Sequence, residues 1–152
     1  MPRPARPLGL SENVKVSAAV FRRLRYIEGF DVSRIVRGVG KTSSQARLVL
    51  ELKRFLALSL IYPHPTYAFS PSLPIDDVWH RFILSTRRYR SFCDEVYGRY
   101  FDHVPGESRA GSRRRIRGGA MPYTLSKLEQ AFGSYDNALW TGDAACGPCE
   151  AA

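Results

Sequence analysis

Residues 70–105 read SPSLPIDDVWHRFILSTRRYRSFCDEVYGRYFDHVP, and this stretch combines metal-ligand side chains with large apolar ones. It holds two of the three histidines of the chain, His80 and His103, together with Cys93, the only cysteine before the tail. Apolar residues repeat at helical spacing around Trp79 and again around Tyr89. We therefore expect this stretch to form helices of the core and to carry the functional site.

The stretch contains two apolar stripes, which fit either one long helix or two helices with a bend. Pro74 is a good residue near a helix start, and Ser85 and Thr86 are good N-caps for a second helix. On one straight helix His80 and Cys93 would lie about 20 Å apart, because each residue adds 1.5 Å. They could share a metal ion only if the chain bends near Thr86. Both alternatives stay open.

The sequence outside this stretch also has helical periodicity. It predicts helices over residues 11–28, 31–38, 42–62 and 123–132, the first of them capped by Ser11 and the last by Thr124. No strand pattern and no internal repeat is present. The expected fold class is therefore all-α, a single compact domain of about five helices over residues 11–140.

Both ends of the chain differ in composition from this domain. Residues 1–10 contain three prolines and two arginines, and we expect them to form a disordered arm. Residues 141–152 are mostly small and include the sequence Cys-Gly-Pro-Cys, so we expect a flexible tail.

Composition restricts the class of protein. The 152 residues suffice for one hydrophobic core, and the net charge is +9, with 23 basic residues of which all but four are arginine. Three cysteines do not make a disulfide framework, and no signal peptide or membrane-spanning apolar run is visible. We expect a cytoplasmic protein with no membrane partner, in a reducing compartment where cysteines serve as ligands or plain thiols.

The sharpest chemical hypothesis is a transition-metal site formed by His80, Cys93 and His103. One thiolate and two imidazoles suit zinc, or else iron or copper, and three protein ligands leave a fourth position for water or substrate. Supporting contacts from a second layer are expected from Asp77, Trp79 and Tyr89. The alternative is a helical interaction module without metal, in which these side chains have structural roles; whether the protein is an enzyme stays open.

Several of these segments resemble the glycine-rich domain-containing protein-like family, over roughly residues 48–140. The resemblance rests on LKRFLALSL, SPSLPIDDVWHRFIL, STRRYRSFCDEVYGRYFDHVP, YTLSKLEQAFG and ALW. It implies helical relatives and a site around Trp79–His80, Cys93 and His103, but no particular reaction. Many relatives carry a second histidine two residues after the first, where this chain has Phe82.

The tail offers a second choice of metal ligands, Cys146 and Cys149. Their spacing is similar to that of a thioredoxin-type redox motif, which needs a helix N-terminus to activate the first thiol. Only three residues follow Cys149, too few for such a helix. A metal-binding or inert tail is therefore the better interpretation.

A third class of function is anion or nucleic-acid binding. The polar segment 106–119 contains a basic cluster, Arg113, Arg114, Arg115 and Arg117. Such a cluster can neutralise phosphates or pair with an acidic protein. No helix-turn-helix, zinc-finger or RNA-binding signature accompanies it. The sequence thus favours loose anion binding over sequence-specific recognition.

Overall fold

The computed structural model of the protein describes residues 1, 5–103 and 120–141. Within these ranges all regular secondary structure is helical, which confirms the predicted all-α fold class. In chain order the elements are the 3-10 helix η1 (Pro7–Gly9) and the α-helices α1 (Ala18–Gly29), α2 (Ser33–Val36), α3 (Thr42–Ile61), α4 (Leu73–Leu84), α5 (Thr86–Tyr97), α7 (Ala120–Phe132) and α8 (Asn137–Trp140).

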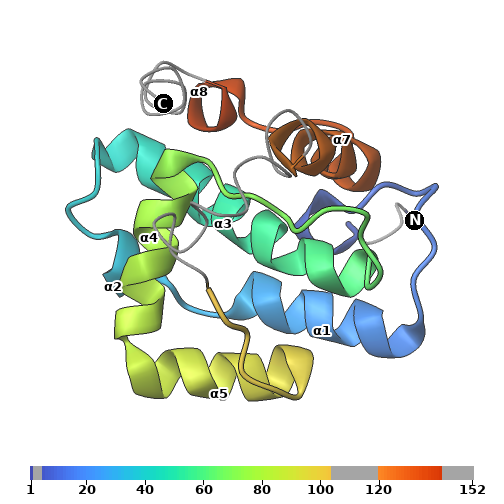
Figure 1. Cartoon of the computed structure of the whole chain (residues 1–152), viewed down its shortest axis with the longest axis horizontal. Coiled ribbons are helices and arrows are strands. Elements are labelled where there is room, and N and C mark those ends of the chain that lie inside the picture. The colour runs from blue at the N-terminus through green and yellow to red at the C-terminus, as the bar shows by residue number, and fades with distance from the viewer. Residues whose placement is uncertain (2–4, 104–119, 142–152) are drawn as a thin grey trace.

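Helix α3 is the centre of the fold, with α1, α4 and α7 packed against it (Figure 1). Its sequence explains this position, because apolar residues occupy more than one face and are buried: Leu48, Leu52, Phe55, Leu56, Ala57 and Leu58. A helix that is apolar on several sides is stable only inside a core. None of the helices in the described part of the chain has the length and apolar character required to cross a membrane.

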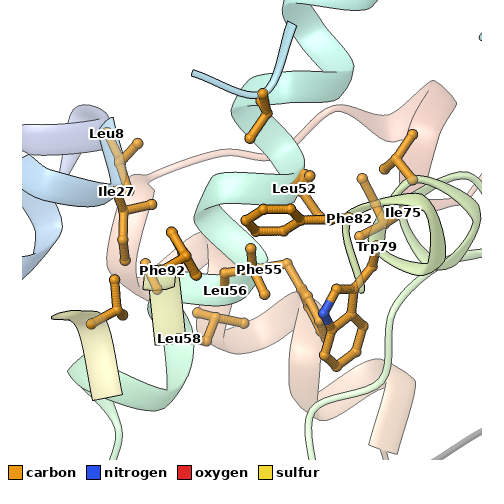
Figure 2. Close-up of a cluster of buried hydrophobic side chains, with 14 of the residues drawn as sticks. Leu8, Ile27, Leu52, Phe55, Leu56, Leu58, Ile75, Trp79, Phe82 and Phe92 are labelled. Atoms are coloured by element: carbon orange, nitrogen blue, oxygen red, sulfur yellow. The ribbon is translucent and has the colours of Figure 1, made fainter. Parts of the chain in front are cut away.

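The core between α3, α4 and α5 is largely aromatic. Figure 2 shows Trp79 and Phe82 of α4 and Phe92 of α5 around the α3 side chains Phe55 and Leu56. The rings of Phe55 and Trp79 meet edge to face at 5.2 Å, and those of Phe82 and Phe92 do so at 5.1 Å. Such pairs add to the stability gained by burying the rings. This packing fixes the rotation of α4, and hence which of its residues reach the surface.

Helices α4 and α5 are separate, which decides between the two alternatives left open by the sequence. Ser85 interrupts the helix with φ −78° and ψ 61°, while its N–H still donates to the carbonyl of Phe82 at 3.0 Å. The chain turns here so that α4 and α5 pack against each other, and α5 also packs against α1. The alternative of two helices with a bend near Thr86 is therefore the one present.

Residues 5–10 do not form the expected disordered arm; residues 2–4 lie outside the described part. Leu8 and Leu10 are each only 3% exposed. The Leu8 N–H donates to Glu28 Oε2 at 2.7 Å, and Arg54 Nε donates to the Leu8 carbonyl at 3.0 Å. Burial of the two leucines holds the segment against the core. Charged side chains of α1 and α3 form hydrogen bonds with its backbone N–H and carbonyl groups.

Two predicted helix starts were also wrong. The first helix begins at Ala18, where the Ser17 hydroxyl accepts the Val20 N–H at 3.1 Å, and not after Ser11. Ser11 is used elsewhere, since its N–H donates to the Ala131 carbonyl at 2.8 Å. The last long helix begins at Ala120, so Thr124 lies inside it and accepts the Ser70 N–H at 2.9 Å instead of capping. In each case the residue that looked like a helix cap makes a hydrogen bond to a segment far away in the sequence.

Gly98 ends α5 in the left-handed conformation, with φ +69°, and the segment leading to His103 starts there. We expect Gly98→Ala to lower the free energy of unfolding by about 1 kcal/mol, because a Cβ disfavours this conformation. Gly29→Ala is the matched control: Gly29 also has open space around it but lacks a positive φ. That change should raise stability by up to about 1 kcal/mol. Urea unfolding followed by circular dichroism measures both, and equal effects would contradict the expectation.

Candidate metal centre

The candidate site lies where α4 meets the segment that follows α5. Asp76 in the first turn of α4 and His80 one turn later share one face of the helix, because side chains four residues apart are neighbours. His103 comes from irregular backbone after α5 and approaches the same face. Two segments separated in sequence therefore contribute to one cluster.

The three side chains meet through their polar atoms. His103 Nε2 lies 2.7 Å from His80 Nε2 and 3.0 Å from Asp76 Oδ1. On the other side of the cluster, His80 Nδ1 lies 3.6 Å from Asp76 Oδ2. One ligand atom from each residue can be chosen so that all lie within 4.8 Å of one another. Among the described residues this is the group of histidine, cysteine and acidic side chains that is close enough to hold a metal ion.

Exposure differs sharply among the three side chains. His103 is 4% exposed, Asp76 27% and His80 44%. The inner side of the cluster is thus closed by the protein, and the side of His80 faces solvent. A ligand bound here would be reached from water on one side only.

Trp79 forms the inner wall of the site. Its ring centre lies 4.2 Å from that of His103, and its own side chain is 3% exposed. The Trp79 Nε1–H donates to the Tyr89 hydroxyl at 3.2 Å, and that hydroxyl donates to the Phe101 carbonyl at 2.6 Å. Both residues therefore contact the segment that carries His103, or its ring, while their role as a second layer around a metal stays a prediction.

Cys93 is not part of the group that the structure brings together. It is fully buried on α5, beside Tyr89 and the backbone of Phe101. Burial raises the pKa of the Cys93 thiol, which disfavours the thiolate form that binds metal. The bend at Ser85 brings α5 back toward α4. Cys93, however, lies on the buried face of α5 and not at the cluster of Asp76, His80 and His103.

Asp76, not Asp77, is the carboxylate that reaches the histidines, while Asp77 is exposed. Position 76 lies one helical turn before His80, a signal that was available in the sequence. Both acidic residues lie near the start of α4, so the favourable position at a helix N-terminus does not by itself distinguish Asp76 from Asp77. Phe82, which replaces the second histidine of many expected relatives, is completely buried in the core and faces away from this cluster.

The other predicted site residues lie outside the described part of the chain. These are the second-choice metal ligands Cys146 and Cys149 and the basic cluster Arg113, Arg114, Arg115 and Arg117. Their roles stay predictions.

The donor set of the cluster is one carboxylate and two imidazoles. Two imidazole nitrogens at 2.7 Å repel unless a proton or a cation lies between them, and either ring can donate that proton, depending on its tautomer. A divalent cation can take the place of the shared proton after a small outward movement of the two rings, because tetrahedral zinc holds its ligand nitrogens farther apart than this. Neutral imidazoles and carboxylates are good ligands for zinc and for ferrous iron. The cluster is thus chemically able to hold either a proton or a metal ion.

Comparison with known proteins yields one family. The model of the UCP032817-like family matches residues 22–126, a stretch that contains Asp76, His80 and His103. No curated protein and no solved structure gave a match. The predicted membership of the glycine-rich domain-containing protein-like family is therefore wrong.

Proposed function

Since the chain belongs to the UCP032817-like family, whose description names neither a reaction nor a ligand, we propose a function from the site itself. The protein binds one divalent transition-metal ion, with zinc as the first ion to test, through Asp76, His80 and His103. The remaining coordination positions face solvent on the side of His80, where exogenous ligands can bind.

One observation carries this proposal: three Lewis-basic side chains from two separate segments converge on one point. A histidine that served only packing would not need to direct a ring nitrogen at a carboxylate and a second imidazole. His103 does so although its ring is almost fully buried against Trp79. Aligned donors of this kind are what a small cation requires.

The open side of the cluster supports exchange of ligands at the ion. Structural zinc sites usually have four protein ligands, whereas sites with three leave a position for water or substrate. A zinc ion held here would supply a bound water that is acidic enough to act as a nucleophile near neutral pH. The exposed face at His80 gives small molecules access to that position. Metal-assisted hydrolysis is therefore the reaction class to assay once binding is established.

The test compares His80→Ala with His64→Ala by zinc titration calorimetry and by metal content after dialysis. His64 is an exposed histidine in the linker between α3 and α4, so its replacement removes an imidazole without touching the cluster. We expect wild-type protein and His64→Ala to bind one zinc ion with the same affinity. His80→Ala should bind it at least about 100-fold more weakly, because loss of a ligand costs more than the roughly 10–100-fold that replacing a hydrogen-bond partner of a ligand costs.

Wild-type protein that binds no zinc, cobalt or ferrous iron would refute the proposal. The helical interaction module without metal would then be the better interpretation. Binding of an acidic protein or nucleic acid through the basic cluster at residues 113–117, and a cytoplasmic location, stay predictions alongside this proposal.

A further inference from the structure

His103 lies on irregular backbone, so its position depends on the contacts of its own segment. The segment begins at Gly98, where α5 ends, and has no helix up to His103. A ligand on such backbone needs supporting hydrogen bonds or packing to hold it within the geometry that a metal demands. Asp76 and His80, in contrast, are held by the helical backbone of α4.

The hydroxyl of Tyr89 ties this segment to the helices. It donates to the carbonyl of Phe101, two residues before His103, at 2.6 Å. The Tyr89 side chain is completely buried, so water cannot replace this bond. The Cys93 thiol also lies beside the Phe101 backbone, but thiols make weak hydrogen bonds.

The same hydroxyl is tied to α4. It accepts the indole N–H of Trp79 at 3.2 Å, and the Trp79 ring in turn lies against the ring of His103. Trp79 stands next to His80 in α4. A continuous chain of contacts therefore runs from α4 through Trp79 and Tyr89 to the segment that places His103.

We propose that Tyr89 is the positioning residue of the site: its hydroxyl sets the place of His103 relative to Asp76 and His80. This inference rests on the proposed metal site for its functional meaning. Its structural content, the placement of the His103 ring, is measurable in protein without metal.

Tyr97 provides a matched control on the same helix. Its hydroxyl donates to a backbone carbonyl at the same distance, 2.6 Å, but the acceptor is Leu56 of α3. Tyr97→Phe and Tyr89→Phe each remove one tyrosine-to-carbonyl hydrogen bond and keep the ring. Tyr89→Phe also removes the acceptor of the Trp79 indole N–H, and it alone releases the backbone of the His103 segment. A merely structural role of Tyr89 therefore predicts a loss of stability in both variants but no change at the His103 ring.

The experiment combines zinc titration with proton NMR of the imidazole resonances in metal-free protein. The Trp79 ring should displace the His103 resonances by its ring current, because the two ring centres are 4.2 Å apart. We expect Tyr89→Phe to lose this displacement and to bind zinc about 10-fold more weakly, as for other supporting hydrogen bonds at metal sites. Tyr97→Phe should keep both the displacement and the affinity.

Unchanged His103 resonances and unchanged zinc affinity in Tyr89→Phe would overturn the inference. If wild-type protein binds no zinc, the proposed function fails, and the imidazole resonances alone then decide whether Tyr89 places His103. Should Tyr89→Phe fail to fold, hydrogen exchange of the Trp79 indole N–H in wild-type protein replaces it. Slow exchange agrees with the buried bond to Tyr89, and exchange at the rate of a free indole contradicts it.

Discussion

Replacing Glu51 with alanine should lower the free energy of unfolding by about 3–5 kcal/mol, as is typical when one partner of a buried ion pair is removed. Glu51 lies on α3 and is 3% exposed. Its two carboxylate oxygens accept from Trp140 Nε1 at 2.6 Å and from Arg54 Nη1 at 3.1 Å. Without the carboxylate, a buried indole N–H loses its acceptor and a largely buried guanidinium loses its ion-pair partner.

Arg54 makes this loss larger, because it connects several elements. It donates to the carbonyl of Leu8 and lies over the ring of Phe132, with its charge 4.9 Å from the ring centre. Glu51 thus helps to hold η1 and α8 against α3. Urea unfolding, followed by tryptophan fluorescence, measures the effect directly because Trp140 reports on the network.

The control for Glu51→Ala is a carboxylate–guanidinium pair at the surface. Arg47 pairs with Asp136 through two bonds of 2.5 and 2.8 Å, but the Arg47 side chain is 55% exposed. Arg47→Ala should therefore cost no more than about 1 kcal/mol. A similar cost for the two variants would show that burial does not make the Glu51 network special.

The helical period in the sequence was sufficient to predict the fold class and the elements that form the core. Leu52 and Phe55 of α3, like Trp79 of α4, are buried at the spacing that the pattern indicated. The ends of elements were harder, because they depend on partners far away in the sequence. Ser11 looks like a helix cap, yet its N–H bonds to the Ala131 carbonyl 120 residues later. No local pattern contains that information.

At the candidate site, too, the sequence predicts what depends on local spacing and misses what depends on distant contacts. The sequence predicted His80 and His103 as partners, and the structure places their Nε2 atoms 2.7 Å apart. The choice of the third residue depends on the direction from which His103 approaches α4. That direction is set by the turn at Gly98 and by the Tyr89 hydroxyl, neither of which is a property of helical periodicity. The sequence therefore favoured Cys93 as the third ligand, and only the turn places Asp76 beside His103.

Asp76→Asn should abolish high-affinity metal binding, with a loss of about 100-fold or more, whereas Cys93→Ala should leave the affinity unchanged. Asparagine keeps the shape of the side chain but removes the negative charge that a divalent ion attracts. Asp76 lies 3.0 Å from His103 Nε2, inside the cluster, and Cys93 is a buried thiol whose raised pKa opposes ligation. Cys93→Ala should cost only the stability of a small cavity.

Cobalt(II) titration followed by absorption separates the two ligand sets in one measurement. A thiolate ligand gives an intense charge-transfer band in the near ultraviolet, and a site of one carboxylate and two imidazoles gives none. Affinity should also fall as the pH is lowered, because metal binding requires the deprotonated form of each ligand. A charge-transfer band that disappears in Cys93→Ala, together with wild-type affinity in Asp76→Asn, would show that Cys93 and not Asp76 completes the site with His80 and His103.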